Sequence, residues 1–157
     1  MLGPFYVEGA PVRERGTDLA AGDRGETATF QGHVRTAGGG PIASALLDVW
    51  QTSANGFYDI QAPAQPRMHL RARFQTGADG HYEFHTLKPV SYPIPTDGPV
   101  GTLLALQGRK PYRPAHTHFI VSAPGHRRLV VEFKPDGKDA QGRAHFLVEY
   151  DFVLERA

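Results

Sequence analysis

Residues 27–50 read TATFQGHVRTAGGGPIASALLDVW, and this stretch decides the fold class. Thr27 to Arg35 is rich in residues that favour β-strands, and the run from Gly38 to Pro41 ends it, because no regular element crosses three glycines and a proline. Ala45 to Trp50 is almost continuously apolar, which predicts a second strand that is buried on both faces. Two strands joined by a glycine-rich turn indicate a protein built mainly from β-sheet.

Short β-like runs separated by turns continue to the C-terminus. Residues 70–76 and 81–86 flank the turn at 77–80 and therefore predict a hairpin. Further β-like runs cover residues 116–122, 128–133 and 145–154, with a turn-rich stretch over 136–142. Together the runs predict roughly seven strands, the pattern of a β-sandwich.

Two regions lack a regular pattern. Residues 1–26 carry turn signals and no hydrophobic period, which predicts an N-terminal arm that wraps the core. Leu87 to Pro114 is a long connection rich in proline and glycine, and only Thr102 to Gln107 favours a helical turn or two. Long loops in compact domains tend to carry function. We expect one domain over residues 1–157, in which these loops build the site.

Composition excludes several classes of protein. The chain has 17 basic and 16 acidic residues, a balance unsuited to nucleic-acid binding as the main task. It has no cysteine, so a metal would need His, Tyr or carboxylate ligands. No apolar run approaches the roughly 20 residues of a membrane span, and the N-terminus lacks a signal-peptide core. We expect a cytoplasmic protein with no nucleic-acid or membrane partner.

The histidines at 116 and 118 stand two positions apart in a β-like run. On a strand, both side chains would project from one face, and together they can bind one ion. Two partly buried, hydrogen-bonded histidines would show the same spacing without a metal. The preceding Arg113 and Pro114 place a permanent cation near the pair. The chain has no acidic residue between Asp97 and Glu132, so this region either handles a small anion or is a basic surface loop.

Other polar residues are weaker candidates for a metal site. Two histidines and one carboxylate form the ligand triad of ferrous oxygenases, so each carboxylate at a predicted strand end is a possible third ligand. These carboxylates are Asp48, Asp59, Asp97 and Glu132. The remaining histidines, which we interpret as structural or surface residues, are His33, His69, His81, His85, His126 and His145.

Several motifs, in the same order along the chain, resemble those of a known family. DVWQTSANGFYD contains Trp50 and Tyr58, SYPIPTDGP contains Tyr92, and GRKPYRPAHTHF contains both histidines of the pair. LGPFYVEGAP at the start and SAPGHR after the pair add to the match. Over essentially its whole length the chain resembles the intradiol ring-cleavage dioxygenases of the catechol and hydroxyquinol type. This resemblance implies a β-sandwich of the prealbumin or immunoglobulin-like kind with long active-site loops.

The resemblance also implies a chemistry. Tyr58, Tyr92, His116 and His118 would bind a non-haem ferric ion, Fe(III), because phenolates are hard anionic donors that suit a trivalent metal. The reaction would insert both atoms of O2 into a catechol-type aromatic diol and give a cis,cis-muconate-type product. Tyr92 would help to take up a substrate proton, and Arg113 would stabilise negative charge that develops on the ring. The expected partners are the diol and O2, with a homo-oligomer as a further expectation.

The sequence departs from the family pattern at three places. Catechol-type members have a helical segment before the LGPFY motif that forms a dimer contact, whereas this chain begins at Met1. Glu132 takes the place of an active-site glutamine, and would either stay protonated and imitate the amide or stay ionised and offset Arg113. The stretch over 134–143 is shorter than in the larger relatives. By the same resemblance Pro4 and Phe5 would line the entrance, and Ile60 and Ala62 would do so by proximity to Tyr58.

Two alternatives from other classes remain open. A non-catalytic β-sandwich binding module would fit the composition, with the histidine pair incidental and no metal held. A ferrous or zinc enzyme would use His116, His118 and Glu132 as a two-histidine, one-carboxylate site. Metal content and colour separate these alternatives from the ferric reading, since only ligation of iron by tyrosine gives a visible charge-transfer band.

Overall fold

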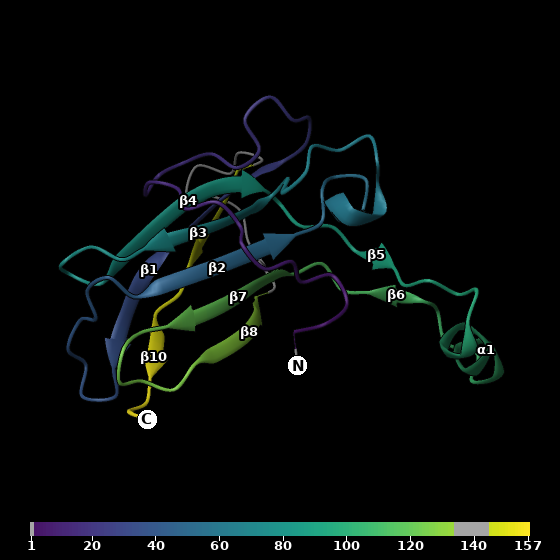
Figure 1. Ribbon diagram of the computed structural model, residues 1–157. Helices are drawn as coiled ribbons and strands as arrows, with labels where there is room; N and C mark the ends of the chain where they lie inside the picture. Colours follow the sequence, from purple (N-terminus) through teal and green to yellow (C-terminus); the bar gives the residue numbers. More distant parts are fainter. Residues whose placement is uncertain (1, 134–144) are drawn as a thin grey trace.

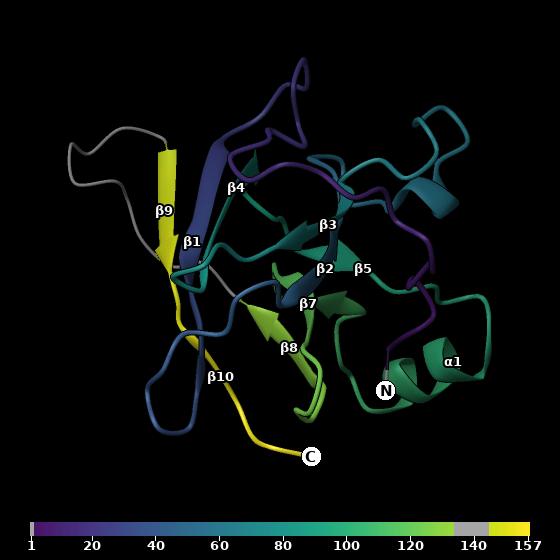
Figure 2. The ribbon, with the colours of Figure 1, turned by 60° about the vertical axis from the view of Figure 1, so that its left-hand side comes forward.

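Two four-stranded sheets face each other across the main core (Figures 1 and 2). The computed structural model describes residues 2–133 and 145–157. The first sheet contains β10 (Phe152–Leu154), β1 (Thr27–Thr36) and β4 (His81–Leu87), with β9 (His145–Glu149) also paired to β1. The second contains β3 (Arg71–Gln75), β2 (Leu46–Gln51), β7 (Thr117–Ser122) and β8 (Leu129–Phe133), in that order. The predicted β-sandwich is confirmed.

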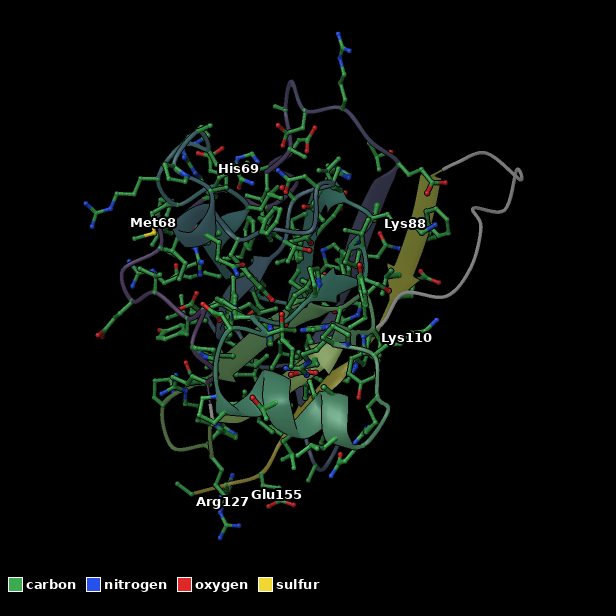
Figure 3. The ribbon with its side chains drawn as sticks, turned by 90° about the vertical axis from the view of Figure 1, so that its right-hand side faces the viewer. Met68, His69, Lys88, Lys110, Arg127 and Glu155 are labelled. Carbon is green, nitrogen blue, oxygen red and sulfur yellow. The ribbon has the colours of Figure 1, made fainter. Side chains whose placement is uncertain are left out.

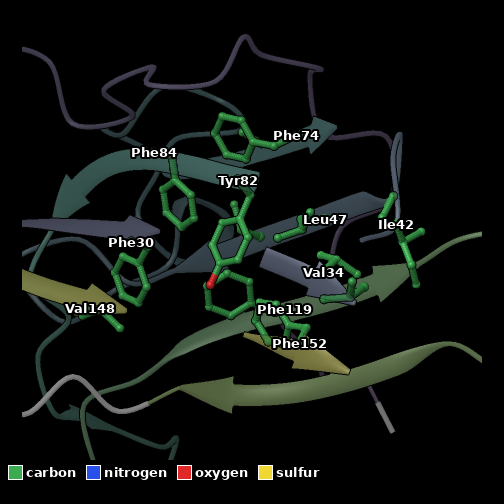
Figure 4. Close-up of a cluster of buried hydrophobic side chains, with 14 of the residues drawn as sticks. Phe30, Val34, Ile42, Leu47, Phe74, Tyr82, Phe84, Phe119, Val148 and Phe152 are labelled. Carbon is green, nitrogen blue, oxygen red and sulfur yellow. The ribbon is translucent and has the colours of Figure 1, made fainter. Parts of the chain in front are cut away.

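Aromatic side chains from both sheets fill the core (Figure 4). Phe84 of β4 stacks on Phe30 of β1 at 5.2 Å between ring centroids and on Phe74 of β3 at 5.0 Å. Phe119 of β7 packs against Phe30 at 5.7 Å. Because side chains alternate along a strand, the residues between these core positions point to the other face of each sheet. In the second sheet that other face builds the candidate site.

The strand β2 is buried on both faces, as its continuous apolar run predicted. It lies between β3 and β7, and all of its residues after Leu46 are buried. Leu47 and Val49 face the main core, whereas Trp50 belongs to a second cluster with Tyr58 and Tyr92. The central position of β2 therefore anchors both clusters.

The predicted strand over 145–154 is in fact two strands, β9 and β10. Both run parallel to β1, β9 along Thr27–Gln31 and β10 along Val34–Thr36. Between these segments the Tyr150 carbonyl comes so close to Gly32 that any Cβ there would collide with it. The Asp151 carboxylate also accepts hydrogen bonds from the His33 amide at 2.7 Å and from Arg35 Nε at 2.9 Å, which interrupts the ladder. The predicted turn over 136–142 and the stretch over 134–143 lie outside the described residues.

The long connection between β4 and β7 contains more regular structure than predicted. It holds β5 (Tyr92–Pro93) and β6 (Tyr112–Arg113), which pair antiparallel, and the helix α1 (Pro99–Leu106) between them. The helix begins earlier than the predicted helical turns because Pro99 is favourable in a first helical turn. Two-residue strands have no hydrophobic period, so sequence reasoning missed them. Figure 1 shows α1 at the far end of the β5–β6 ribbon, away from both sheets.

The N-terminal arm runs along the outer edges of two strands. The Arg13 amide donates to the Arg73 carbonyl of β3 at 2.9 Å, and the Arg73 amide donates to the Pro11 carbonyl at 2.8 Å. Further along, the Gly16 amide donates to the Glu83 carbonyl of β4 at 2.9 Å. The arm thus pairs with an edge of each sheet, where backbone groups would otherwise lack partners.

Surface segments lie at opposite ends of the molecule. In Figure 3 Met68 and His69, which follow the short 3-10 helix η1 (Asp59–Gln61), lie far from Arg127 and Glu155. The last two form an exposed ion pair at 3.4 Å beside the C-terminus. Among the described residues, no helix is both long enough and apolar enough to cross a membrane.

Candidate metal centre and active-site cleft

The two histidines converge as their spacing predicted. The Nε2 atoms of His116, just before β7, and His118, on β7, lie 3.0 Å apart. Both residues are buried. The alternation of side chains on β7 therefore brings two ring nitrogens to one point.

Two tyrosines from separate loops join the histidines. The Tyr58 hydroxyl lies 3.2 Å from His118 Nε2. The Tyr58 ring packs edge-on against the Tyr92 ring, with 5.5 Å between the ring centroids. The Tyr92 ring in turn packs against the His116 ring, with 5.4 Å between the ring centroids. Tyr58 follows a turn at Gly56, whose φ of 81° is in the region that favours glycine. Four of the predicted site residues therefore lie together, brought by three segments of the chain.

The surroundings of each histidine orient its ring. His116 Nδ1 lies 2.7 Å from the Pro114 carbonyl, which can only accept, so Nδ1 carries a hydrogen and Nε2 is the nitrogen that faces the cluster. Burial, together with the nearby His116, lowers the pKa of His118 to about 4, so this ring is neutral at pH 7. The Trp50 indole stacks on the His118 ring at 4.6 Å with an interplanar angle of 6°. The Pro114 carbonyl and the Trp50 indole therefore fix the orientation of the two rings.

The donor atoms fit a metal ion. Two donors bound to one ion at right angles, with bonds of about 2.1 Å, would lie about 3 Å apart. The observed separations are 3.0 Å between the ring nitrogens and 3.2 Å from His118 Nε2 to the Tyr58 hydroxyl. Burial and the hydrogen bond with Tyr92 raise the pKa of Tyr58, so a phenolate there needs a strong cation beside it. Two tyrosine oxygens with two imidazoles are a donor set that suits ferric iron.

Arg113 and Glu132 form an ion pair beside the donor cluster. Arg113 on β6 is in register with Tyr92, and Glu132 on β8 is in register with His118. Arg113 Nη2 donates to both carboxylate oxygens of Glu132, at 2.7 and 2.6 Å. Burial would raise the pKa of Glu132, but the hydrogen bond from Arg113 and the neighbouring His116 outweigh it, so the pKa lies below its ordinary value. Of the two predicted states of Glu132, this favours the ionised one.

A cleft of about 350 Å³ opens onto the cluster. Its walls combine the start of the N-terminal arm with residues of β2, β5, β6, β7 and β8. They are Leu2, Gly3, Pro4, Phe5, Trp50, Tyr92, Ile94, Arg113, His118 and Glu132. Phe5 also stacks on the Tyr58 ring at 4.6 Å. Pro4 and Phe5 thus line the cleft, whereas Ile60 and Ala62 do not belong to its lining.

The other candidate ligands lie elsewhere. Asp48 accepts a hydrogen bond from the Tyr6 hydroxyl at 3.1 Å, Asp59 pairs with Arg71, and Asp97 is exposed. Among the described residues, only His116, His118 and Glu132 form a group of three or more histidines and acids with ligand atoms within 4.8 Å of one another.

The remaining histidines have partners away from the cluster. His33 and His69 pair with aspartates, His85 contacts Thr29, and His126 contacts the Pro124 carbonyl. His81 meets the ring of His33 at 5.3 Å. The side chain of His145 lies outside the described residues.

The sequence did not predict the role of one buried ion pair near the site. Asp59, a candidate metal ligand in the sequence, instead accepts hydrogen bonds from Arg71 on β3, and both side chains are almost fully buried. A charged residue inside the predicted strand LRARFQT was the only signal in the sequence, and it did not identify a partner.

The chain is similar to proteins of one kind in three comparisons. The sequence profile of a family described as "Dioxygenase" matches residues 1–155. Hydroxyquinol 1,2-dioxygenase of Rhizobium sp. (strain MTP-10005) is 46% identical over 157 residues, which cover 99% of this chain and 53% of that protein. Catechol 1,2-dioxygenase 2 of Acinetobacter lwoffii is 42% identical over 136 residues, covering 86% of this chain and 50% of that protein.

Solved structures show the same similarity. Hydroxyquinol 1,2-dioxygenase from Pseudomonas putida DLL-E4 superposes with a TM-score of 0.90 at 37% identity, over 100% of this chain and 65% of that one. The 3-chlorocatechol 1,2-dioxygenase from Rhodococcus opacus 1CP gives a TM-score of 0.87 at 30% identity, over 100% of this chain and 71% of that one. The chain spans about half the length of the curated relatives described here.

Proposed function

The chain belongs to the intradiol ring-cleavage dioxygenase family, and from this premise we propose that it inserts both atoms of O2 into a catechol-type aromatic diol. The substrate is catechol, hydroxyquinol or a substituted catechol, and the product is of the cis,cis-muconate type. The observation that carries this proposal is the convergence of the Tyr58 hydroxyl and the two histidine Nε2 atoms, 3.0 to 3.2 Å apart, at the end of the cleft.

Under this proposal Tyr58, Tyr92, His116 and His118 hold a non-haem ferric ion. The donor set supports it, because two phenolates and two imidazoles stabilise the trivalent state. When bound, ferric iron takes both oxygens of a diol and draws electron density from the ring.

The remaining roles fall to side chains around the cluster. Tyr92 takes up a diol proton at its phenolic oxygen. Arg113, in register with Tyr92, stabilises negative charge that develops on the ring, and Glu132 holds the guanidinium through two hydrogen bonds. Trp50, Ile94 and Phe5 provide apolar walls. The cleft of about 350 Å³ is within the size range of small-molecule sites.

The visible spectrum of the purified full-length chain, with iron quantified, tests this proposal. We expect a coloured ferric protein whose band shifts on anaerobic addition of catechol or hydroxyquinol, because the diol joins the iron's ligands. Admission of O2 should then consume the diol and form the ring-opened diacid. A protein that stays colourless after ferric loading would overturn the proposal.

A second candidate uses Glu132 as a ligand. One ligand atom from each of His116, His118 and Glu132 lies within 4.8 Å of the others, which favours a ferrous or zinc site. Against it, both Glu132 oxygens accept hydrogen bonds from Arg113. A colourless protein with stoichiometric ferrous iron or zinc would support this candidate. The same preparation with no stoichiometric metal would support a binding module.

Other expectations from the sequence stay predictions. We propose that residues 1–157 act as one catalytic unit, with the first 26 residues as an arm that pairs with β3 and β4. A cytoplasmic location and a homo-oligomeric state remain predictions, the first from composition and the second from family resemblance.

A further inference from the structure

A buried ion pair lies directly behind Tyr58. Oδ1 of Asp59, the next residue, accepts a hydrogen bond from Arg71 Nε at 2.7 Å, and Arg71 Nη2 makes an ion-pair contact with the same oxygen at 2.6 Å. Its Oδ2 accepts from the Met68 amide at 2.9 Å. The side chains of Arg71 and Asp59 are 1% and 3% exposed, so this pair is sequestered from water.

The Arg71 cation reaches the ring of Tyr58. The guanidinium carbon lies 5.8 Å from the ring centroid, within the range of a cation–π contact. Arg71 is not among the residues that line the cleft, so it cannot act on a substrate there by contact. Its direct contact with the donor cluster is the ring of Tyr58.

Packing alone does not explain this arrangement. Both Asp59 oxygens accept hydrogen bonds, but among the described residues the buried Arg71 Nη1 has no hydrogen-bond partner, and Nη2 contacts Asp59 Oδ1 only as an ion pair. A buried donor without a partner is unfavourable, and apolar side chains of similar volume often replace buried ion pairs without loss of stability. Stability alone therefore does not account for a guanidinium at this position.

We propose that Asp59 and Arg71 are positioning residues for Tyr58. Asp59 holds the guanidinium, and its positive charge beside the ring stabilises the negative charge that Tyr58 carries as a ligand. The pair also keeps the Tyr58 hydroxyl directed at His118 Nε2, 3.2 Å away. This inference rests on the proposed function, in which Tyr58 holds ferric iron.

Charge variants of the full chain, loaded with ferric iron, test the proposal through the tyrosine-to-iron charge-transfer band. Arg71→Met removes the cation, so the phenolate electrons are less tightly held and the band should move to longer wavelength. Asp59→Asn removes the negative charge and leaves the cation, so the band should move to shorter wavelength. Arg71→Lys keeps the charge without the fork and should give a smaller shift than Arg71→Met.

Iron affinity gives a second readout. Arg71→Met should weaken ferric binding by about 10–100-fold, the usual loss when a residue that supports a metal ligand is removed. Arg73→Met is the matched control, because Arg73 lies two residues along β3 and its Nε donates to the Ala10 carbonyl at 2.6 Å. The control should keep the wild-type band and affinity.

The outcomes separate the two proposals. A folded Arg71→Met protein with the wild-type band and affinity would overturn the role of the pair, as would a loss of thermal stability with no spectral shift. If Arg71→Met does not fold, Arg71→Lys and Asp59→Asn provide the test. Arg71→Lys should move the band to longer wavelength and Asp59→Asn to shorter wavelength, and an unshifted band in both would overturn the role of the pair. If the wild-type protein shows no charge-transfer band, the proposed function fails and this inference with it.

Discussion

The second sheet has two faces that differ in chemistry although the same strands build both. On the core face of β2 and β7, four successive apolar side chains are at most 1% exposed, and the polar Thr117 and Gln51 at the end of the face hydrogen-bond to each other. The apolar residues are Leu47, Val49, Phe119 and Val121. The other face mixes charged, imidazole, aromatic and aliphatic side chains at positions that are also buried. It includes Asp48, Trp50, His118 and Ile120.

The difference teaches that stability and chemistry are divided between alternate residues of one strand. Apolar residues on the core face lose water without any polar cost. On the site face, burial works against charge, and it raises the pKa of Asp48 while it lowers the pKa of His118. Substitutions on the two faces should therefore fail in different ways.

Truncation of the core face should have the largest effect. Phe119→Ala removes a ring that contacts Phe30, Phe84 and Phe152, and should lower the free energy of unfolding by about 3–5 kcal/mol. Chemical denaturation measures this loss. Where the variant is still folded, its iron content should match the wild type, and a colourless folded variant would show that the two faces are not separable.

Substitution of His118, which precedes Phe119, should affect iron binding more than stability. His118→Gln removes a proposed ligand and should weaken ferric binding by more than about 100-fold, beyond the loss caused by a supporting residue. The unfolding free energy should change less than in Phe119→Ala, because no core contact is lost. Iron titration and denaturation of the same preparations check both expectations. Wild-type iron affinity in His118→Gln would remove this residue from the metal site.

A charge-conserving change on the site face should leave iron in place. Arg113→Lys keeps a positive charge but cannot reproduce the planar guanidinium, so turnover should fall at least about tenfold. Colour and iron content should remain those of the wild type. Steady-state oxygen uptake measures the rate, and unchanged turnover would exclude Arg113 from the mechanism.

The smallest effect should come from the partner of that arginine. Glu132→Gln removes the carboxylate that offsets Arg113. Because the pair is partly exposed, the activation free energy of turnover should change by only about 0.2–1 kcal/mol, or about 1.4–5-fold in rate. We expect turnover to rise by this factor, since the amide oxygen can still accept a hydrogen bond from the guanidinium while the negative charge that offsets Arg113 is gone. A loss of iron instead would indicate that Glu132 is a metal ligand.

Sequence reasoning was strongest where one strand carries its own signal. TATFQGHVR and ALLDVW predicted β1 and β2, and the spacing of the two histidines predicted their convergence. It was weakest in the connection from Leu87 to Pro114, where β5 and β6 have two residues each. The family resemblance named Tyr92 and Arg113, but their antiparallel register appears only in the folded chain.

The sequence by itself determined which residues alternate on a strand, because the period of two is a property of the local backbone. It also determined, through the family motifs, which side chains to suspect. Only the tertiary structure decided how they meet. The contacts from Tyr58 to His118, Arg71 to Asp59 and Arg113 to Glu132 join residues 60, 12 and 19 positions apart. Such pairs depend on how loops are placed by packed sheets, and no local pattern encodes that placement.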